Sequence, residues 1–237
     1  MTEKRMKVYF QDSKWQTWEQ FKENMIEPTN SYEECYRKIS NVFYNYGHHE
    51  IIPWEYFKEI YHDIPREYRV PLLLELPYQS YKIKLDELID MIDEYLQSET
   101  KQEKENRIAR NKELLSHRTN GNGIILYRGI AENYLLPENA LSYTLDKEVA
   151  DSFLEYHNSR HGSQFGFVYD RDVSIEDENI LFYSNNRSEQ EVFYWSEDMN
   201  SFSAMLKLGP DYDYNYYLTE DTLIDYVDDY DIIWFND

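Results

Sequence analysis

Residues 120–128, Asn-Gly-Asn-Gly-Ile-Ile-Leu-Tyr-Arg, mark the point at which the character of the chain changes. The asparagines and glycines indicate a turn, and the β-branched and aromatic run from Ile124 to Arg128 is typical of a strand. Further runs of this composition are Phe165 to Tyr169, Ile180 to Tyr183, Val192 to Trp195 and, near the end, Ile232 to Phe235. Residues 121–237 are therefore predicted to form a unit built on a β-sheet.

A helix is expected between the first two strands, from Asp146 to Tyr156, with an Asp or a Thr at its start as the capping residue. The apolar residues that share one face of it are Val149, Ala150, Phe153 and Leu154. Their spacing places Phe153 in the core. Because one strand, one helix and then several strands follow each other, the order favours an α+β fold over alternating βαβ units.

Residues 1–120 favour helices. The clearest pattern has one apolar face formed by Leu85, Leu88, Ile89, Ile92 and Leu96. Prolines should keep the earlier helices short or bent, because proline lacks an amide donor; they are Pro53, Pro65, Pro71 and Pro77. The highly charged stretch Glu99 to Arg118 is interpreted as a solvated helix or a linker to the next unit.

The chain is strongly acidic. It holds 24 Lys and Arg against 46 Asp and Glu, a net charge of −22, and 17% of its residues are aromatic. The aromatic content predicts a folded protein, whereas the charge disfavours direct nucleic-acid binding and favours basic partners. A single cysteine, Cys35, and no apolar run of about 20 residues predict a cytoplasmic protein with no membrane partner. Delivery into a host cell by a dedicated machine is compatible with this prediction.

Three short segments carry the chemistry. They are Leu126-Tyr127-Arg128-Gly129, Leu141-Ser142-Tyr143-Thr144 and Arg187-Ser188-Glu189-Gln190-Glu191-Val192. In this order they resemble the Arg, Ser-x-Thr/Ser, Glu-x-Glu pattern of the ADP-ribosyltransferases similar to cholera toxin and the clostridial actin-modifying toxins, a pattern also found in bacterial and phage proteins. The resemblance covers residues 121–195. It implies a split β-sandwich that holds NAD in a central cleft, releases nicotinamide and passes ADP-ribose to an acceptor.

The residue types suit a nucleotide substrate. The planar fork of donors on Arg128 matches a phosphate, and Gly129 would let the backbone approach a flat ring closely. Ser142 and Thr144 alternate along an extended segment, so both hydroxyls point to one side and could bind a ribose or hold a carboxylate. By resemblance, Ser142 takes the supporting role.

Two carboxylates complete the predicted site. Cleavage at the anomeric carbon of the nicotinamide ribose passes through an oxocarbenium-like state, which the carboxylate of Glu191 would stabilise. Glu189, two residues earlier, could orient or deprotonate the nucleophile. In the resembling family a Glu at this position goes with arginine as the acceptor, so a protein arginine is favoured.

No metal site is predicted. His157 and His161 share a helical face but lack a third ligand. Residues 211, 213 and 215 imitate the start of a calcium loop, yet Tyr216 replaces its glycine and Thr222 its glutamate. The chain also has no P-loop and no GxGxxG motif.

The sequence thus predicts an NAD-dependent mono-ADP-ribosyltransferase, a toxin or phage-type effector that modifies a host protein. The alternatives are an NAD glycohydrolase of the same fold, in which water replaces the acceptor, and a non-enzymatic acidic inhibitor that mimics nucleic acid or captures a basic partner. The inhibitor would make Glu191 dispensable and its binding strongly salt-dependent.

Overall fold

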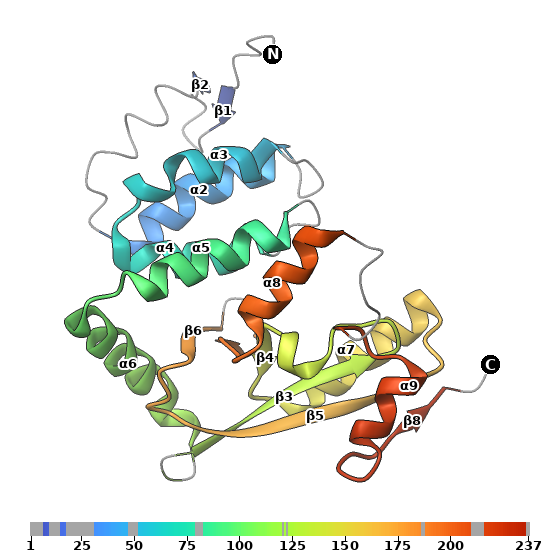
Figure 1. The fold of residues 1–237 in the computed structure, drawn as a ribbon. Coiled ribbons are helices and arrows are strands. Elements are labelled where there is room, and N and C mark those ends of the chain that lie inside the picture. The colour runs from blue at the N-terminus through green and yellow to red at the C-terminus, as the bar shows by residue number, and fades with distance from the viewer. Residues whose placement is uncertain are drawn as a thin grey trace. The chain divides into compact units, whose positions relative to one another are not determined.

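The computed structural model describes residues 7–9, 15–17, 31–46, 52–78, 83–119, 121, 123–185, 188–209 and 216–235 (Figure 1). The chain divides into two compact units, Met1–Leu88 and Ile89–Asp237. The sequence predicts a boundary near residue 120, whereas the division between these compact units falls inside helix α5 (Leu85–Gln97). The reason is that the charged helix after α5 belongs to the sheet-bearing unit, as described below.

The first unit is mainly helical, as predicted. Its described elements are β1 (Lys7–Tyr9), paired antiparallel with β2 (Trp15–Thr17), and then α2 (Tyr32–Tyr46), α3 (Ile52–Ile60), η1 (Tyr61–Asp63) and α4 (Arg66–Glu75). The strand pair was not predicted. Proline lies in the first turn of α3 and at the N-cap of α4, positions that need no amide donor. Pro71 lies inside α4, which ends after ten residues.

Aromatic residues fill the core of this unit. Trp54 stacks on Phe57 with ring centroids 6.4 Å apart, and Phe43 meets the same ring edge-on. A polar cluster lies next to Trp54. Its Glu87 carboxylate accepts hydrogen bonds from Trp54 Nε1 at 3.0 Å and from Lys58 Nζ at 2.6 Å. Burial acts to raise the pKa of Glu87, but hydrogen bonds from Lys58, Lys84 and Trp54 outweigh it and lower that pKa to about 2.

The second unit is built on one antiparallel sheet with the strand order β6-β7-β4-β3-β5-β8. The strands are β3 (Gly123–Ala131), β4 (Ser142–Thr144), β5 (Phe165–Ser174), β6 (Ile180–Ser184), β7 (Glu191–Tyr194) and β8 (Ile233–Trp234). Every predicted strand has its counterpart here. Because the helices do not alternate with parallel strands, the α+β prediction is confirmed at this level.

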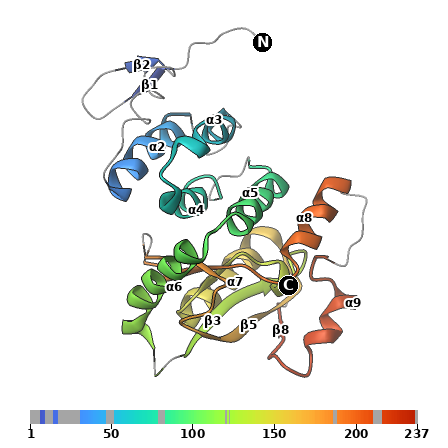
Figure 2. The same cartoon turned by 60° about the vertical axis from the view of Figure 1, so that its left-hand side comes forward.

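Helices surround this sheet. They are α6 (Lys101–Leu115), α7 (Lys147–His161), α8 (Met199–Leu208) and α9 (Glu220–Leu223), with shorter turns η2 (Ser116–Arg118), η3 (Pro137–Asn139) and η5 (Ile224–Tyr226). Helix α7 is the predicted helix; the Asp146 side chain caps it, and Gly162 ends it in a left-handed conformation. It lies against β3 and β5 in both views of the ribbon (Figures 1 and 2).

Two strand glycines allow α7 to come this close. A Cβ atom at Gly129 would lie 2.5 Å from the Ala150 carbonyl oxygen, and one at Gly166 would lie 2.5 Å from Leu154 Cδ1. The buried side of α7 is therefore centred on Ala150 and Leu154. The sequence predicts Phe153 in the core, but it is 43% exposed. Consecutive helical positions point about 100° apart, and Leu154, the residue after it, takes the buried position.

Two clusters of strand residues and tyrosines form the core of the second unit. One cluster joins β3, β4, β6 and β7 through Ile124, Leu126, Tyr143, Ile180, Val192 and Tyr194. A second cluster, formed by Ile130, Phe165, Phe167, Leu218 and Leu223, is covered by Tyr226 and Tyr230 from the C-terminal segment. The ring of Phe167 lies 5.1 Å from each of those two tyrosine rings.

The charged segment Glu99 to Arg118 is a helix, but it is not solvated on all sides. Arg107 is 5% exposed and forms a bidentate pair with the Glu99 carboxylate, with N···O distances of 2.9 and 2.8 Å. It also donates to the backbone oxygens of Glu178 and Ile180, and Asn111 donates to Ile180 as well. The prediction of a solvated helix or linker is therefore wrong, because α6 is docked on β6 through buried polar groups.

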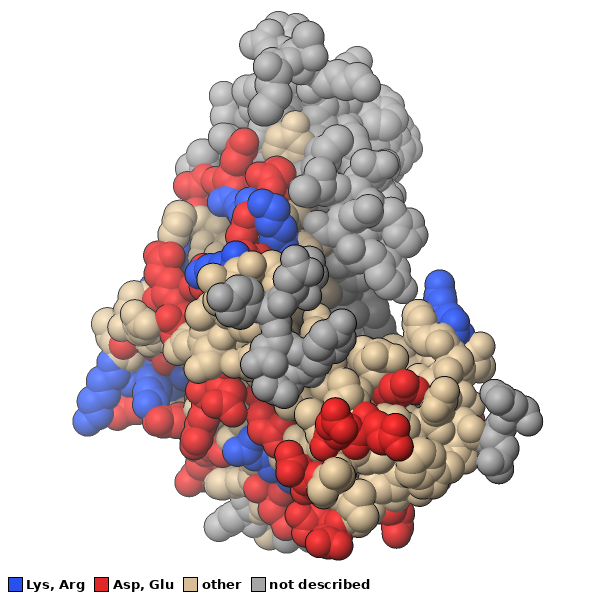
Figure 3. Space-filling model, turned by 45° about the vertical axis from the view of Figure 1, so that its right-hand side comes forward, with Lys and Arg blue, Asp and Glu red and all other residues tan. Residues whose placement is uncertain are grey.

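The described surface agrees with the acidic composition. On the face seen in Figure 3, the carboxylate side chains, in red, cover more of the surface than the lysines and arginines, in blue. Among the residues that the structure describes, no helix is both long and apolar enough to cross a membrane.

Candidate active site

The three predicted segments meet in the sheet of the second unit. Arg128 lies on β3, Ser142 begins β4 and Glu191 begins β7, and β4 pairs with both neighbours. The Ser142 hydroxyl donates a hydrogen bond to Glu191 Oε1, and Arg128 Nη1 donates to the backbone oxygen of Ser142. Arg128 and Glu191, 63 positions apart in the chain, are thus linked through one serine, and all three side chains are only partly buried.

The strand register explains why Ser142 and Glu191 can meet. Thr144 pairs with Glu191 and Ser142 pairs with Phe193, so Ser142 and Glu191 are diagonal neighbours on one face of the sheet. Tyr143 and Val192, which alternate with them, are buried on the opposite face. A shift of the register by one residue would separate the hydroxyl from the carboxylate.

Thr144 has a different environment from Ser142. It is 6% exposed, and its hydroxyl donates to the backbone oxygen of Glu189 at 2.6 Å. The hydroxyl oxygen of Thr144 also accepts from the Asp146 amide at 3.1 Å. The Thr144 hydroxyl therefore bonds to the protein backbone here, whereas the sequence predicts a contact with the substrate. It ties the segment before β7 to the start of α7.

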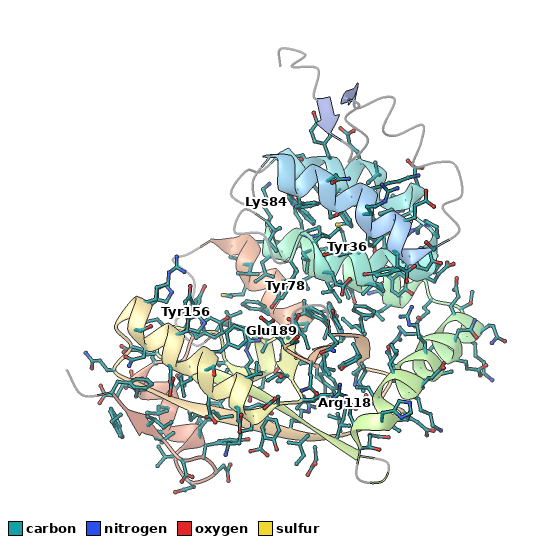
Figure 4. The ribbon with its side chains drawn as sticks, turned by 180° about the vertical axis from the view of Figure 1, so that it is seen from behind. Tyr36, Tyr78, Lys84, Arg118, Tyr156 and Glu189 are labelled. Atoms are coloured by element: carbon teal, nitrogen blue, oxygen red, sulfur yellow. The ribbon has the colours of Figure 1, made fainter. Side chains whose placement is uncertain are left out.

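The backbone around Glu189 is unusual. Ser188 and Gln190, on either side of it, have positive φ values of 59° and 49°, which non-glycine residues rarely adopt. Thr144 holds the Glu189 carbonyl, and the Leu145 amide donates to the Gln190 carbonyl at 3.1 Å. Figure 4 labels Glu189, whose side chain is partly exposed. The predicted residue Arg187 lies outside the described residues.

Tyr134 also belongs to this site, although it was not predicted. Its hydroxyl accepts a hydrogen bond from Arg128 Nη2 at 3.0 Å, and the Arg128 guanidinium carbon lies 5.1 Å from its ring centroid. The chain contains 24 tyrosines, so nothing in the sequence singled this one out.

His157 packs behind Tyr134. The two ring centroids are 4.6 Å apart, and His157 stacks on His161 at 5.6 Å. Burial, together with the charges of His161 and Arg128, lowers the pKa of His157. Within the described ranges, no group of three or more His, Cys, Asp or Glu side chains could hold a metal ion, and the calcium-like residues 211–215 lie outside those ranges.

Gly129 has a packing role that the sequence did not reveal. The side of its Cα atom where a side chain would project is occupied by the backbone of α7. Close approach of a substrate ring to Gly129 remains a prediction, and it would have to use another side of the residue.

The arrangement brings together a guanidinium, a hydroxyl and a carboxylate from three neighbouring strands, and Glu189 lies two residues before that carboxylate in the chain. Such a set can bind an anionic group and stabilise positive charge that develops on a sugar carbon. No protein family, curated protein or solved structure matches this chain at a significant level. The geometry and the chemistry of these residues therefore carry the functional interpretation.

Proposed function

We propose that this protein is a mono-ADP-ribosyltransferase of the split β-sandwich fold, which uses NAD to modify a protein. The observation that carries the proposal is the contact of the Ser142 hydroxyl with the Glu191 carboxylate, next to Arg128. The three motif residues belong to β3, β4 and β7, and in sequence they are separated by a helix and several strands. Their meeting supports a shared chemical role.

In the proposed reaction, the bond between C1′ of the ribose and the nicotinamide nitrogen breaks, and the electron pair leaves with nicotinamide. The oxocarbenium-like sugar is stabilised by the carboxylate of Glu191, which the Ser142 hydroxyl holds in place. Arg128 binds a phosphate of NAD. A nucleophile on the acceptor then forms the new bond to C1′, and its proton passes to Glu189.

The acceptor proposed is an arginine of a host protein, because Glu189 stands at the position that goes with arginine in the resembling family. The net charge of −22 would also attract a basic acceptor surface. This proposal makes the protein a toxin or phage-type effector that acts inside a cell.

The test uses labelled NAD, a host-cell lysate and three proteins: the wild type, Glu191→Gln and the control Glu197→Gln, which changes an exposed glutamate of the same unit. We expect the wild type and the control to release nicotinamide and label a discrete protein, and Glu191→Gln to lose more than about 100-fold of both rates. Nicotinamide release without label would indicate a glycohydrolase. No NAD consumption by the folded wild type would reject both activities and favour the acidic inhibitor.

A further inference from the structure

The guanidinium of Arg128 is in contact with a tyrosine that comes from outside the three motif segments. Tyr134 lies in the turn after β3, six residues beyond Arg128. It offers its hydroxyl to Nη2 at 3.0 Å, and its ring centroid lies 5.1 Å from the guanidinium carbon. One side chain therefore provides both a hydrogen-bond acceptor and an aromatic ring to the same cation.

The backbone of Tyr134 is fixed on both sides. Its amide donates to the Ala131 carbonyl at 3.0 Å, and its carbonyl accepts from the Leu218 amide at 2.6 Å. The preceding residue, Asn133, adopts a left-handed conformation with φ of 61° and donates to the Leu218 carbonyl at 2.8 Å. The turn is thus bonded to the segment before α9, which limits how far the tyrosine can move.

The ring is fixed from the side of α7 as well. His157 lies 4.6 Å from it, centroid to centroid, and is itself stacked on His161 and in edge contact with Tyr156. The charged and titratable groups around His157 are therefore Arg128, Tyr134, Tyr156 and His161. Burial, with the Coulombic effects of His161 and Arg128 acting in the same direction, lowers the pKa of His157, which favours an uncharged imidazole against the tyrosine ring.

We infer that Tyr134 is a positioning residue that holds the Arg128 guanidinium in the orientation needed to bind the NAD phosphate. The inference rests on the proposed function. Arg128 donates through Nη1 to the Ser142 carbonyl and through Nη2 to the Tyr134 hydroxyl, so a backbone oxygen holds one arm of its fork and the tyrosine oxygen holds the other. A fork fixed before the substrate arrives loses less side-chain entropy on binding. The expected consequence is a lower KM for NAD and an unchanged kcat.

The experiment measures kcat and KM for NAD in the full-length wild type, Tyr134→Phe, Tyr134→Leu and the control Tyr230→Phe. The control removes another partly buried phenol hydroxyl of the same unit, which donates to the Asp170 carbonyl at 3.2 Å. Tyr134→Phe keeps the ring and loses the acceptor, so KM should rise about tenfold. Tyr134→Leu also loses the ring, and KM should rise by about fiftyfold in total. We expect kcat to stay within about twofold in all variants and the control to behave as the wild type.

The outcomes separate the two proposals. If the wild type neither binds nor consumes NAD, the proposed function fails, and the inference fails with it. If the wild type consumes NAD and Tyr134→Phe has the same KM, only the positioning role is rejected. A fall in kcat with unchanged KM would also overturn it, because the tyrosine would then act in the chemical step. Equal melting temperatures of the wild type and Tyr134→Phe exclude unfolding as the cause.

Discussion

Two arginines of the second unit illustrate two uses of the same side chain. Arg107, at the edge formed by α6 and β6, is 5% exposed, and its partner Glu99 has a side chain that is 3% exposed. Arg128, on the inner strand β3 beside β4, is only partly buried, and the hydrogen bonds described for it end on a backbone carbonyl and a tyrosine hydroxyl. The first arginine is surrounded by the carboxylate and carbonyls that dock a helix. The second is held by a strand carbonyl and a turn tyrosine, next to the contact of Ser142 with Glu191.

This difference separates stability from function. A buried charge that is matched by a buried counter-charge costs several kcal/mol when one partner is removed. A partly exposed guanidinium contributes less to folding and can still donate hydrogen bonds to an anion. The Arg107 region should therefore respond to substitution as a structural element, and the Arg128 region as a site.

The largest effect is expected for Arg107→Met. The change leaves the Glu99 carboxylate buried without its partner and removes the bonds to the Glu178 and Ile180 carbonyls. The free energy of unfolding should fall by about 3–5 kcal/mol, measured by urea denaturation of the full chain. The double variant Arg107→Met/Glu99→Met removes both charges and should recover most of this loss.

The matched variant Arg128→Met sharpens the contrast. It should lower the stability by about 1 kcal/mol and reduce kcat/KM for NAD by about 100-fold or more. Equal stability losses for Arg107→Met and Arg128→Met would mean that the two arginines do not differ in role. The contrast would also fail if the single and double variants at Arg107 were equally unstable.

A smaller effect is expected for Gly129→Ala, which tests how the Arg128 region depends on α7. The added Cβ would lie 2.5 Å from the Ala150 carbonyl oxygen and 3.1 Å from the Leu154 amide, both backbone atoms that cannot rotate away. We expect a loss of about 1–3 kcal/mol by the same denaturation measurement. Gly123→Ala is the control, because the nearest atom to a Cβ there is 3.7 Å away. Equal stability of the two variants would show that α7 moves freely on the strand.

Much of the fold could be predicted, because strands and helices leave local patterns. Runs such as Ile124 to Arg128 became β3, and the capped segment after Asp146 became α7. What failed depended on contacts between distant residues. The charged pattern of α6 carried no sign that Arg107 docks on β6, and the helical spacing of Phe153 could not reveal that the buried face of α7 is centred on Ala150 and Leu154.

In the candidate site, too, some residues could be predicted from local patterns and others depend on contacts between distant residues. Arg128, Ser142 and Glu191 were identified from short motifs, and the register of β4 and β7 then decided that Ser142 meets Glu191. Tyr134 and the inner position of Thr144 depend on how a turn and a loop fold back, so no spacing rule predicts them. The catalytic roles remain predictions for the experiments above.

The smallest effect concerns pH and also belongs to the Arg128 region, because His157 is part of its packing. The pKa of His157 in the folded protein lies below its ordinary value of 6.5. The His157 side chain therefore binds a proton more readily in the unfolded chain than in the folded protein. The stability contributed by the neutral His157 is complete above pH 6.5 and is lost as the pH falls through the lowered pKa. His157→Gln cannot titrate there and should lose less stability than the wild type between pH 7 and pH 5. His117→Gln, which changes an exposed histidine, should keep the wild-type dependence. Identical pH profiles for all three proteins would show that His157 is solvated, and Tyr134 would then lack the support from α7 that we infer.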